Sequence, residues 1–287
     1  MQVLVGWIIV LGCVLGGFAY SGGNPAHLVV IGEYIIIIGV SLGYVFGACP
    51  MSYLKLLINQ VLTAFKGSPY KQKAYVDLIS AFYELFMIAR EQGVIGIEDH
   101  VVNPQNSAVF KKYPSFLNNS LAVAFAQNAL KPIIDGRIKG DQVKHLLHEE
   151  MERIEHRNEQ PLHVATKAAD AMPGIGIVAA VLGIIITMSH ISGDKTTIGV
   201  KVAHALVGTF LGILISYGFL QPLISAMEFN NADEKQYYEV LTNIISSYAT
   251  GAPPIMAAES GRRAIPSDRQ MPSEQLEEQL KALSKKG

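Results

Sequence analysis

Few side chains in the apolar stretches of this 287-residue chain could bind an ion or carry a proton. Charged residues are missing from residues 1–32, 34–54, 171–193 and 202–227, and Glu33 alone stands between the first two runs. Charge chemistry inside a membrane normally uses a buried ionisable side chain that faces a cavity. Glu33 is the only candidate for such a side chain. It lies near one end of its stretch, so it is either an acid at the membrane surface, the interpretation that we favour, or a group that takes part in such chemistry.

The polar side chains deep in the third and fourth apolar stretches are the hydroxyls of Thr187, Thr209 and Ser216. A hydroxyl in a membrane helix most often bonds the backbone of its own helix. The chain alone is therefore not expected to bind and release an ion midway across a membrane. If ions cross beside it, a partner should supply the carboxylate that titrates.

Signatures of enzymes are absent from the sequence, which has no nucleotide-binding loop, no paired catalytic carboxylates, no HExxH motif and no nucleophile elbow. Cys13 and Cys49 are too few for a disulfide framework or a four-cysteine metal site. The formal net charge of -1 lacks the basic excess of nucleic-acid-binding proteins. We expect no enzyme, no cofactor, no metal and no nucleic-acid partner.

The composition is that of a membrane protein. Half of the residues are apolar and 16% are charged, against about 25% charged in soluble domains. A membrane-spanning helix needs about 20 apolar residues. Four such helices fit the sequence, at roughly 3–20, 28–48, 173–192 and 202–223.

Lysine and arginine are concentrated in two segments, which predicts the orientation of the chain. Residues 49–171 hold 14 of the 23 basic residues and the tail after 224 holds seven, whereas the connections 21–27 and 193–201 hold none and two. Both termini and the long insert should then lie in the cytoplasm. The expected protein is an all-α integral membrane protein with four transmembrane helices. Its segments are a membrane hairpin 1–48, a helical cytoplasmic domain 49–171, a second hairpin 172–223 and a cytoplasmic helical tail 224–287.

Apolar residues at helical spacing predict helices in the insert and the tail. Residues 74–92 should form one helix that stops at Gly93. Residues 141–158 should form another that continues through 160–172 into the third span. The tail should be helical to about 248 and break at 251–254, and a short amphipathic helix should follow. Its apolar positions are Leu276, Leu280 and Leu283.

Small residues recur four apart in every predicted span, which allows close approach of membrane helices. They are Gly12 and Gly16; Gly39, Gly43 and Gly47; Ala179 and Gly183; and Gly208 and Gly212. Packing within one chain and packing between copies explain this spacing equally well. Pro173 and Pro222 bracket the second hairpin, either as simple helix punctuation or as a hinge that passes movement from the membrane to the insert.

Two runs of the second hairpin resemble the third and fourth spans of the MotA family of flagellar stator subunits. They are DAMPGIGIVAAVLG, residues 170–183, and AHALVGTFLGILISYGFLQPL, residues 203–223. The start GWIIVLGCVLGGFAYSGG and the tail element GAPPIMAAESGRR, residues 251–263, are similar to the same family. The likeness covers nearly the whole chain and fits the layout of two hairpins around an insert.

The resemblance implies a subunit of an inner-membrane ring, a pentamer, around two copies of a MotB-like partner that carries the ion-binding aspartate. Ion flow would turn the ring, and the insert would push the rotor protein FliG. Arg90 and Glu98 match the family's rotor-contacting positions, and Pro173 and Pro222 match its two prolines at the inner membrane edge.

Three further positions match the family's ion path: Asp170, Thr209 and Ala180. Sodium-driven relatives carry threonine at the position of Ala180, so the resemblance favours protons over a sodium-driven stator. An ExbB- or TolQ-like energiser of outer-membrane processes is a second reading. Four spans, with the insert after the second, speak against it, because those relatives usually have three spans and their cytoplasmic region follows the first. A membrane scaffold that conducts no ions and a stand-alone transporter are weaker alternatives.

Overall fold

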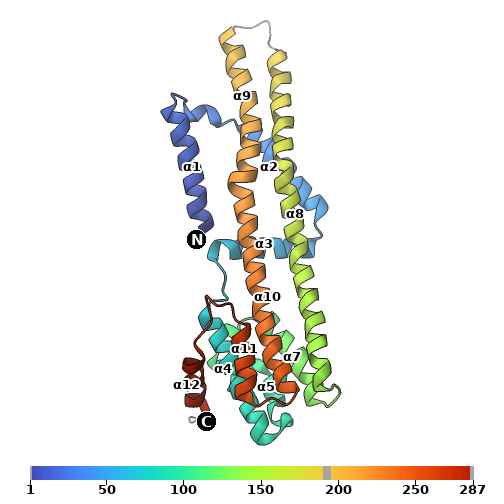
Figure 1. The fold of residues 1–287 in the computed structure, drawn as a ribbon. Helices are drawn as coiled ribbons and strands as arrows, with labels where there is room; N and C mark the ends of the chain where they lie inside the picture. The colour runs from blue at the N-terminus through green and yellow to red at the C-terminus, as the bar shows by residue number, and fades with distance from the viewer. Residues whose placement is uncertain (1, 190–194, 285–287) are drawn as a thin grey trace. The chain divides into compact units, whose positions relative to one another are not determined.

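The computed structural model describes residues 2–189 and 195–284, and this part of the chain is helical with no strand (Figure 1). The expected all-α class is confirmed. The α-helices are α1 (Gln2–Tyr20), α2 (Ile31–Ala48), α3 (Met51–Lys66), α4 (Gln72–Gln92), α5 (Glu98–Val102), α6 (Pro114–Leu117), α7 (Ser120–Ile134), α8 (Gly140–Met188), α9 (Lys195–Ile213), α10 (Gln221–Ala249), α11 (Pro254–Ala264) and α12 (Ser273–Ser284). Short 3-10 turns complete the chain, η1 (Pro25–Leu28), η2 (Val94–Ile97), η3 (Pro104–Asn106) and η4 (Phe110–Lys112), and a π-helical segment, η5 (Leu214–Leu220), joins α9 to α10.

Within the described residues, four helical stretches are long and apolar enough to cross a membrane. They lie within Gln2–Tyr20, Pro25–Ala48, Gly140–Met188 and Ile198–Ala249, which agrees with the four predicted spans. The last three residues of the predicted third span, 190–192, lie outside the described residues.

The chain forms two compact units. Unit 1 comprises residues 1–67 and 157–230, and unit 2 comprises residues 68–156 and 231–287. The units differ from the segments that we predicted from the sequence. Helix α3, which we placed in the insert, belongs to unit 1 with the membrane helices, and the tail from residue 231 belongs to unit 2 with the insert. The long helices α8 and α10 each contribute residues to both units.

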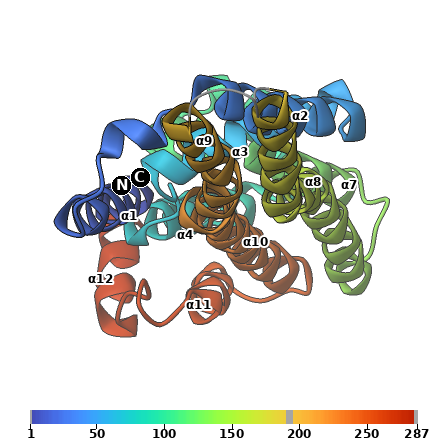
Figure 2. The ribbon, with the colours of Figure 1, turned by 90° about the horizontal axis from the view of Figure 1, so that it is seen from above.

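Unit 1 packs its helices through small and apolar side chains. Helices α8 and α9 lie side by side (Figures 1 and 2). The amphipathic helix α3 buries Leu54 and Leu57 in a cluster with Val3 of α1 and Leu223 of α10. Trp7 of α1 fixes this end, because its ring meets Phe65 edge-on at 5.3 Å and its Nε1 donates to the carbonyl of Phe219 at 3.1 Å.

Unit 2 is built around α4. The apolar positions that predicted this helix, from Leu78 to Ala89, are all buried, and they pack against α7, α10, α11 and α12. Phe86 stacks on Tyr248 with ring centroids 3.8 Å apart. The helix ends as expected at Gly93, whose φ of +80° is a conformation that favours glycine. The predicted continuous helix into the third span and the short helix around Leu276 and Leu280 are also confirmed.

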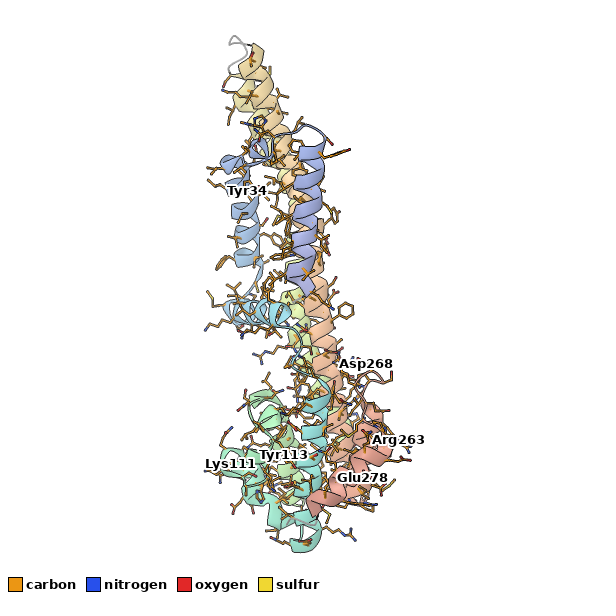
Figure 3. The ribbon with its side chains drawn as sticks, turned by 90° about the vertical axis from the view of Figure 1, so that its left-hand side faces the viewer. Tyr34, Lys111, Tyr113, Arg263, Asp268 and Glu278 are labelled. Carbon is orange, nitrogen blue, oxygen red and sulfur yellow. The ribbon has the colours of Figure 1, made fainter. Side chains whose placement is uncertain are left out.

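A cluster of ion pairs stabilises α11, which overlaps the MotA-like tail segment 251–263. Glu259 accepts hydrogen bonds from Nε of Arg262 at 2.7 Å and from Nε of Arg263 at 2.9 Å. Figure 3 labels Arg263 on α11 and Glu278 on the neighbouring α12. The hydrogen bond from Arg262 is the main reason that the pKa of the Glu259 carboxyl falls to about 2.

We expect Glu259→Gln to lower the free energy of unfolding by about 1–2 kcal/mol at neutral pH. A lowered pKa stabilises the folded chain above the ordinary value of 4.5, and this contribution disappears as the pH falls toward about 2. Unfolding of the purified chain followed across this range should therefore show the deficit shrinking with acid. Glu278→Gln, at an exposed acid of α12, is the control. A deficit that does not change with pH contradicts this account.

Candidate functional site

The backbones of α8 and α9 touch where the two helices carry glycine. A Cβ atom on Gly176 would lie 2.7 Å from the carbonyl oxygen of Gly208, and one on Gly212 would lie 2.6 Å from the carbonyl oxygen of Met172. Real Cβ atoms essentially never approach that closely. Packing within one chain therefore explains the small residues of the third and fourth spans.

The small residues of the first two spans behave differently. A Cβ on Gly12, Gly16, Gly39, Gly43 or Gly47 would meet no atom within 4 Å. The close-packing surfaces of α1 and α2 are thus uncovered in a single chain. Packing between copies stays the alternative that fits them.

Glu33, the one charged residue between the first two apolar runs, is buried. Its side chain is 5% exposed, and its Oε2 has no hydrogen-bond partner among the described residues. Glu33 is therefore packed inside the protein, and its depth in the membrane stays a prediction. The carboxylate fits against α8 and α9 because Gly183 and Gly208 leave room for it. Buried polar groups normally have a partner, so Oε2 is expected to meet a group that the described residues do not supply.

Pro173 lies inside α8 and leaves one backbone carbonyl without its helical donor. A proline has no N–H, so the carbonyl of the residue four positions earlier, Ala169, loses its partner. Ala169 is fully buried. Oγ of Ser216, itself 0% exposed, donates to this carbonyl at 2.8 Å. The hydroxyl of Ser216 therefore bonds a neighbouring helix. The hydroxyl of Thr187 bonds its own helix as expected, at 2.8 Å to the carbonyl of Gly183.

The backbone just before Pro222 is also irregular. The seven residues before α10 form the π-helical segment Leu214–Leu220, and the N–H of Gln221 donates to the carbonyl of Ser216, five residues earlier. A π-helical turn absorbs an extra residue and is frequent at functional sites. The π-helical segment thus ends two residues before Pro222, and Ser216 of this segment bonds the carbonyl that Pro173 leaves free.

The predicted ion-path residues lie in unit 1. Ala180 is buried, and its backbone nitrogen would be 3.0 Å from a Cβ on Gly208, the residue before Thr209. Thr209 is half-buried on α9. Asp170 is exposed on α8, and its Oδ1 accepts a hydrogen bond from Nε2 of Gln221 at 2.8 Å. The structure therefore brings Ala180 close to the backbone of α9 and ties Asp170 to the residue before Pro222.

Arg90 and Glu98 lie on either side of one turn of unit 2. Arg90 is in the last turn of α4, Glu98 begins α5, and both side chains are exposed. Between them η2 presents Ile95, which is 74% exposed. A charged surface with an exposed apolar residue suits contact with another protein better than chemistry on a small molecule.

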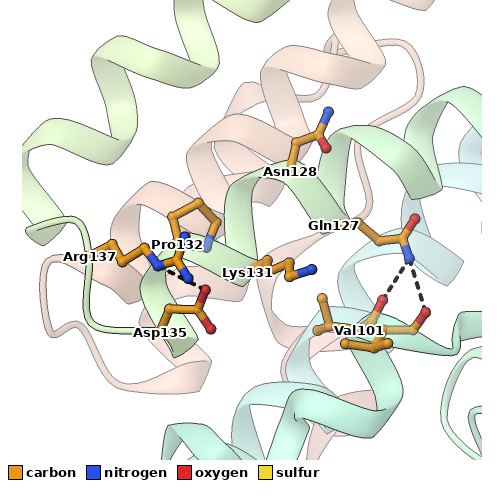
Figure 4. Close-up of a pocket in the computed structure, with 8 residues that line it drawn as sticks. Val101, Gln127, Asn128, Lys131, Pro132, Asp135 and Arg137 are labelled. Carbon is orange, nitrogen blue, oxygen red and sulfur yellow. Dashed lines mark hydrogen bonds and ion pairs between the residues drawn. The ribbon is translucent and has the colours of Figure 1, made fainter.

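A hollow of about 420 Å³ adjoins α5 on the same unit (Figure 4). Nε2 of Gln127 donates to the carbonyl of Val101 at 2.8 Å, and Arg137 pairs with Asp135 at 3.2 Å. The amide of Gln127 and the Arg137–Asp135 pair already have partners, and we assign no ligand to this hollow. Across the described residues, no three His, Cys, Asp or Glu side chains are grouped to hold a metal ion.

Comparison with known proteins identifies the class. Residues 4–93 match the model "Motility protein A N-terminal", and residues 117–240 match the model "MotA/TolQ/ExbB proton channel family". Motility protein A of Salmonella typhimurium is 31% identical over 283 residues, which cover 99% of this chain and 96% of that protein. Chemotaxis protein LafT of Vibrio parahaemolyticus is 32% identical over 280 residues, covering 98% of each.

Solved structures share the fold. The MotAB structure from C. jejuni gives a TM-score of 0.76 at 19% identity and covers 95% of this chain and 97% of that one. The flagellar MotAB stator complex from Bacillus subtilis gives 0.73 at 23% identity and covers 92% and 96%. This chain belongs to the MotA/TolQ/ExbB proton channel family and, within it, to the motility protein A group of flagellar stator subunits.

Replacing Gly212 by alanine should separate α8 from α9, because the added Cβ would meet the rigid backbone of Met172. Overpacking of this kind costs about 1–3 kcal/mol, so we expect a clear loss of thermal stability in detergent. Gly16→Ala is the matched control, since its Cβ would enter open space. Equal stability of the two variants would show that the close contact is not needed.

Proposed function

We propose that this chain is a stator subunit that conducts protons across the inner membrane with a MotB-like partner and converts the flow into torque on the rotor. The observation that carries the proposal is its relation to motility protein A along 99% of its length. The relatives are stator and channel proteins, and no enzyme activity is proposed. Copies of the chain would form a ring, a pentamer, with both termini in the cytoplasm and membrane lipid around its spans.

The partner would supply the titrating group. Charged residues are absent from the apolar stretches of α8 and α9. Among the described residues, Glu33 is the one buried acid of the membrane helices, and its open Oε2 supports a place for it beside the ion path. One proton crossing a potential of 100 mV releases about 2.3 kcal/mol. That suffices for a small conformational step without covalent chemistry.

The identity of the ion rests on Ala180, where sodium-driven relatives have threonine. A buried methyl group offers no oxygen to a sodium ion, whereas a proton needs no coordination shell. Asp170 and Thr209 are assigned to the same path. A sodium-driven stator is the alternative for the ion.

Swimming speed tests both the function and the ion. Cells that rely on this chain and its cognate partner should swim at a speed that does not depend on sodium at fixed membrane potential. A protonophore in sodium-free buffer should stop them. Speed that follows sodium keeps the stator and removes the proton assignment. Normal swimming after deletion, with no second stator present, removes the stator and favours an ExbB- or TolQ-like energiser.

Arg90 and Glu98 are proposed to contact the rotor protein FliG. Their exposure at one turn of unit 2 supports this contact. Arg90→Glu and Glu98→Arg should lower torque while proton uptake persists, because both residues belong to unit 2 and the predicted ion path belongs to unit 1. Rotation of tethered cells and proton uptake report the two effects separately. Lys111→Glu, at another exposed charge of unit 2, is the control, and joint loss of uptake and torque would indicate misfolding instead.

A further inference from the structure

The freed carbonyl of Ala169 and the hydroxyl of Ser216 carry an inference that the family relation does not supply. Proline is tolerated in a membrane helix where a neighbouring side chain replaces the missing backbone donor. The bond from Ser216 to Ala169 is 2.8 Å long, and both residues are fully buried, so water does not compete for it. The side chain that compensates for Pro173 thus comes from the π-helical segment that ends just before Pro222.

The position of Ser216 couples its hydroxyl to the backbone of the π-helical segment. Its own carbonyl accepts from the N–H of Gln221, the residue before Pro222. A change of the segment between π and α geometry would shift Ser216 along α8 and break the bond to Ala169. Conversely, straightening α8 at Pro173 would draw the Ala169 carbonyl away from the hydroxyl.

We propose that Ser216 is a positioning residue that joins the segments at Pro173 and Pro222 into one hinge. The proposal rests on the proposed function, because it assumes that the two prolines move during the ion-driven step. Neither segment would then change shape without the other. The hydroxyl contacts no ion in this account and acts only through the backbone.

A double-mutant cycle tests the bond without a working motor. Ser216→Ala should shift the unfolding equilibrium of the purified chain about threefold or more toward the unfolded state, as other hydrogen bonds between membrane helices do. In Pro173→Ala, residue 173 regains its N–H and can donate to Ala169, so adding Ser216→Ala should change nothing further. Equal effects of Ser216→Ala in both backgrounds would overturn the proposal. Thr187→Val is the control, because it removes a hydroxyl that bonds the Gly183 carbonyl of its own helix.

Rotation and uptake test the coupling. In cells with the cognate partner, Ser216→Ala should lower torque more than proton uptake, because ions still pass while the two segments move independently. Equal losses of torque and uptake, or no loss at all, would overturn the coupling. If the unaltered chain drives no motor, the proposed function fails, whereas the unfolding cycle still decides whether Ser216 compensates for Pro173.

Discussion

Direct contact between the backbones of α8 and α9 is the constraint on which the packing of unit 1 depends. Gly176 and Gly212 allow the contact, since neither tolerates a Cβ atom. The same approach lets the Ser216 hydroxyl reach the Ala169 carbonyl at 2.8 Å and leaves a recess for the Glu33 carboxylate. Without the glycines, Pro173 would leave a buried carbonyl unpaired, which costs about 1–3 kcal/mol.

The distribution of charge complements this packing. The apolar stretches of α8 and α9 carry no charged residue, and the carboxylate of Glu33 from α2 is buried against them. The exposed charges Arg90 and Glu98 lie in the other unit. Open glycine surfaces on α1 and α2 leave room for further helices. A subunit that is incomplete alone and finished by assembly agrees with these features.

Much of the fold could be predicted from the sequence because its signals are local. Runs without charge marked the spans, and the spacing from Leu78 to Ala89 marked α4 with its stop at Gly93. The amphipathic helix α3 was missed, although Leu54 and Leu57 carry the helical signal. The extra helix α11 was also missed, because two prolines at its start read as a break.

The contacts that define the site could not be predicted because they join distant residues. Ser216 bonds a carbonyl 47 positions away, and only the register between two helices decides this. The burial of Glu33 likewise depends on Gly183 and Gly208, which no local pattern connects to it. One signal for the Ser216 contact was available in the sequence: Pro173 leaves the Ala169 carbonyl without its helical donor, so another group had to donate to it.

Proton uptake by proteoliposomes tests the central claim most directly. Vesicles with an imposed membrane potential would hold this chain alone, its MotB-like partner alone, or both. The account predicts uptake only when both are present, and its loss when the partner's membrane aspartate is replaced by asparagine. Uptake by this chain alone would contradict the account, because the conducting carboxylate would then belong to the chain itself.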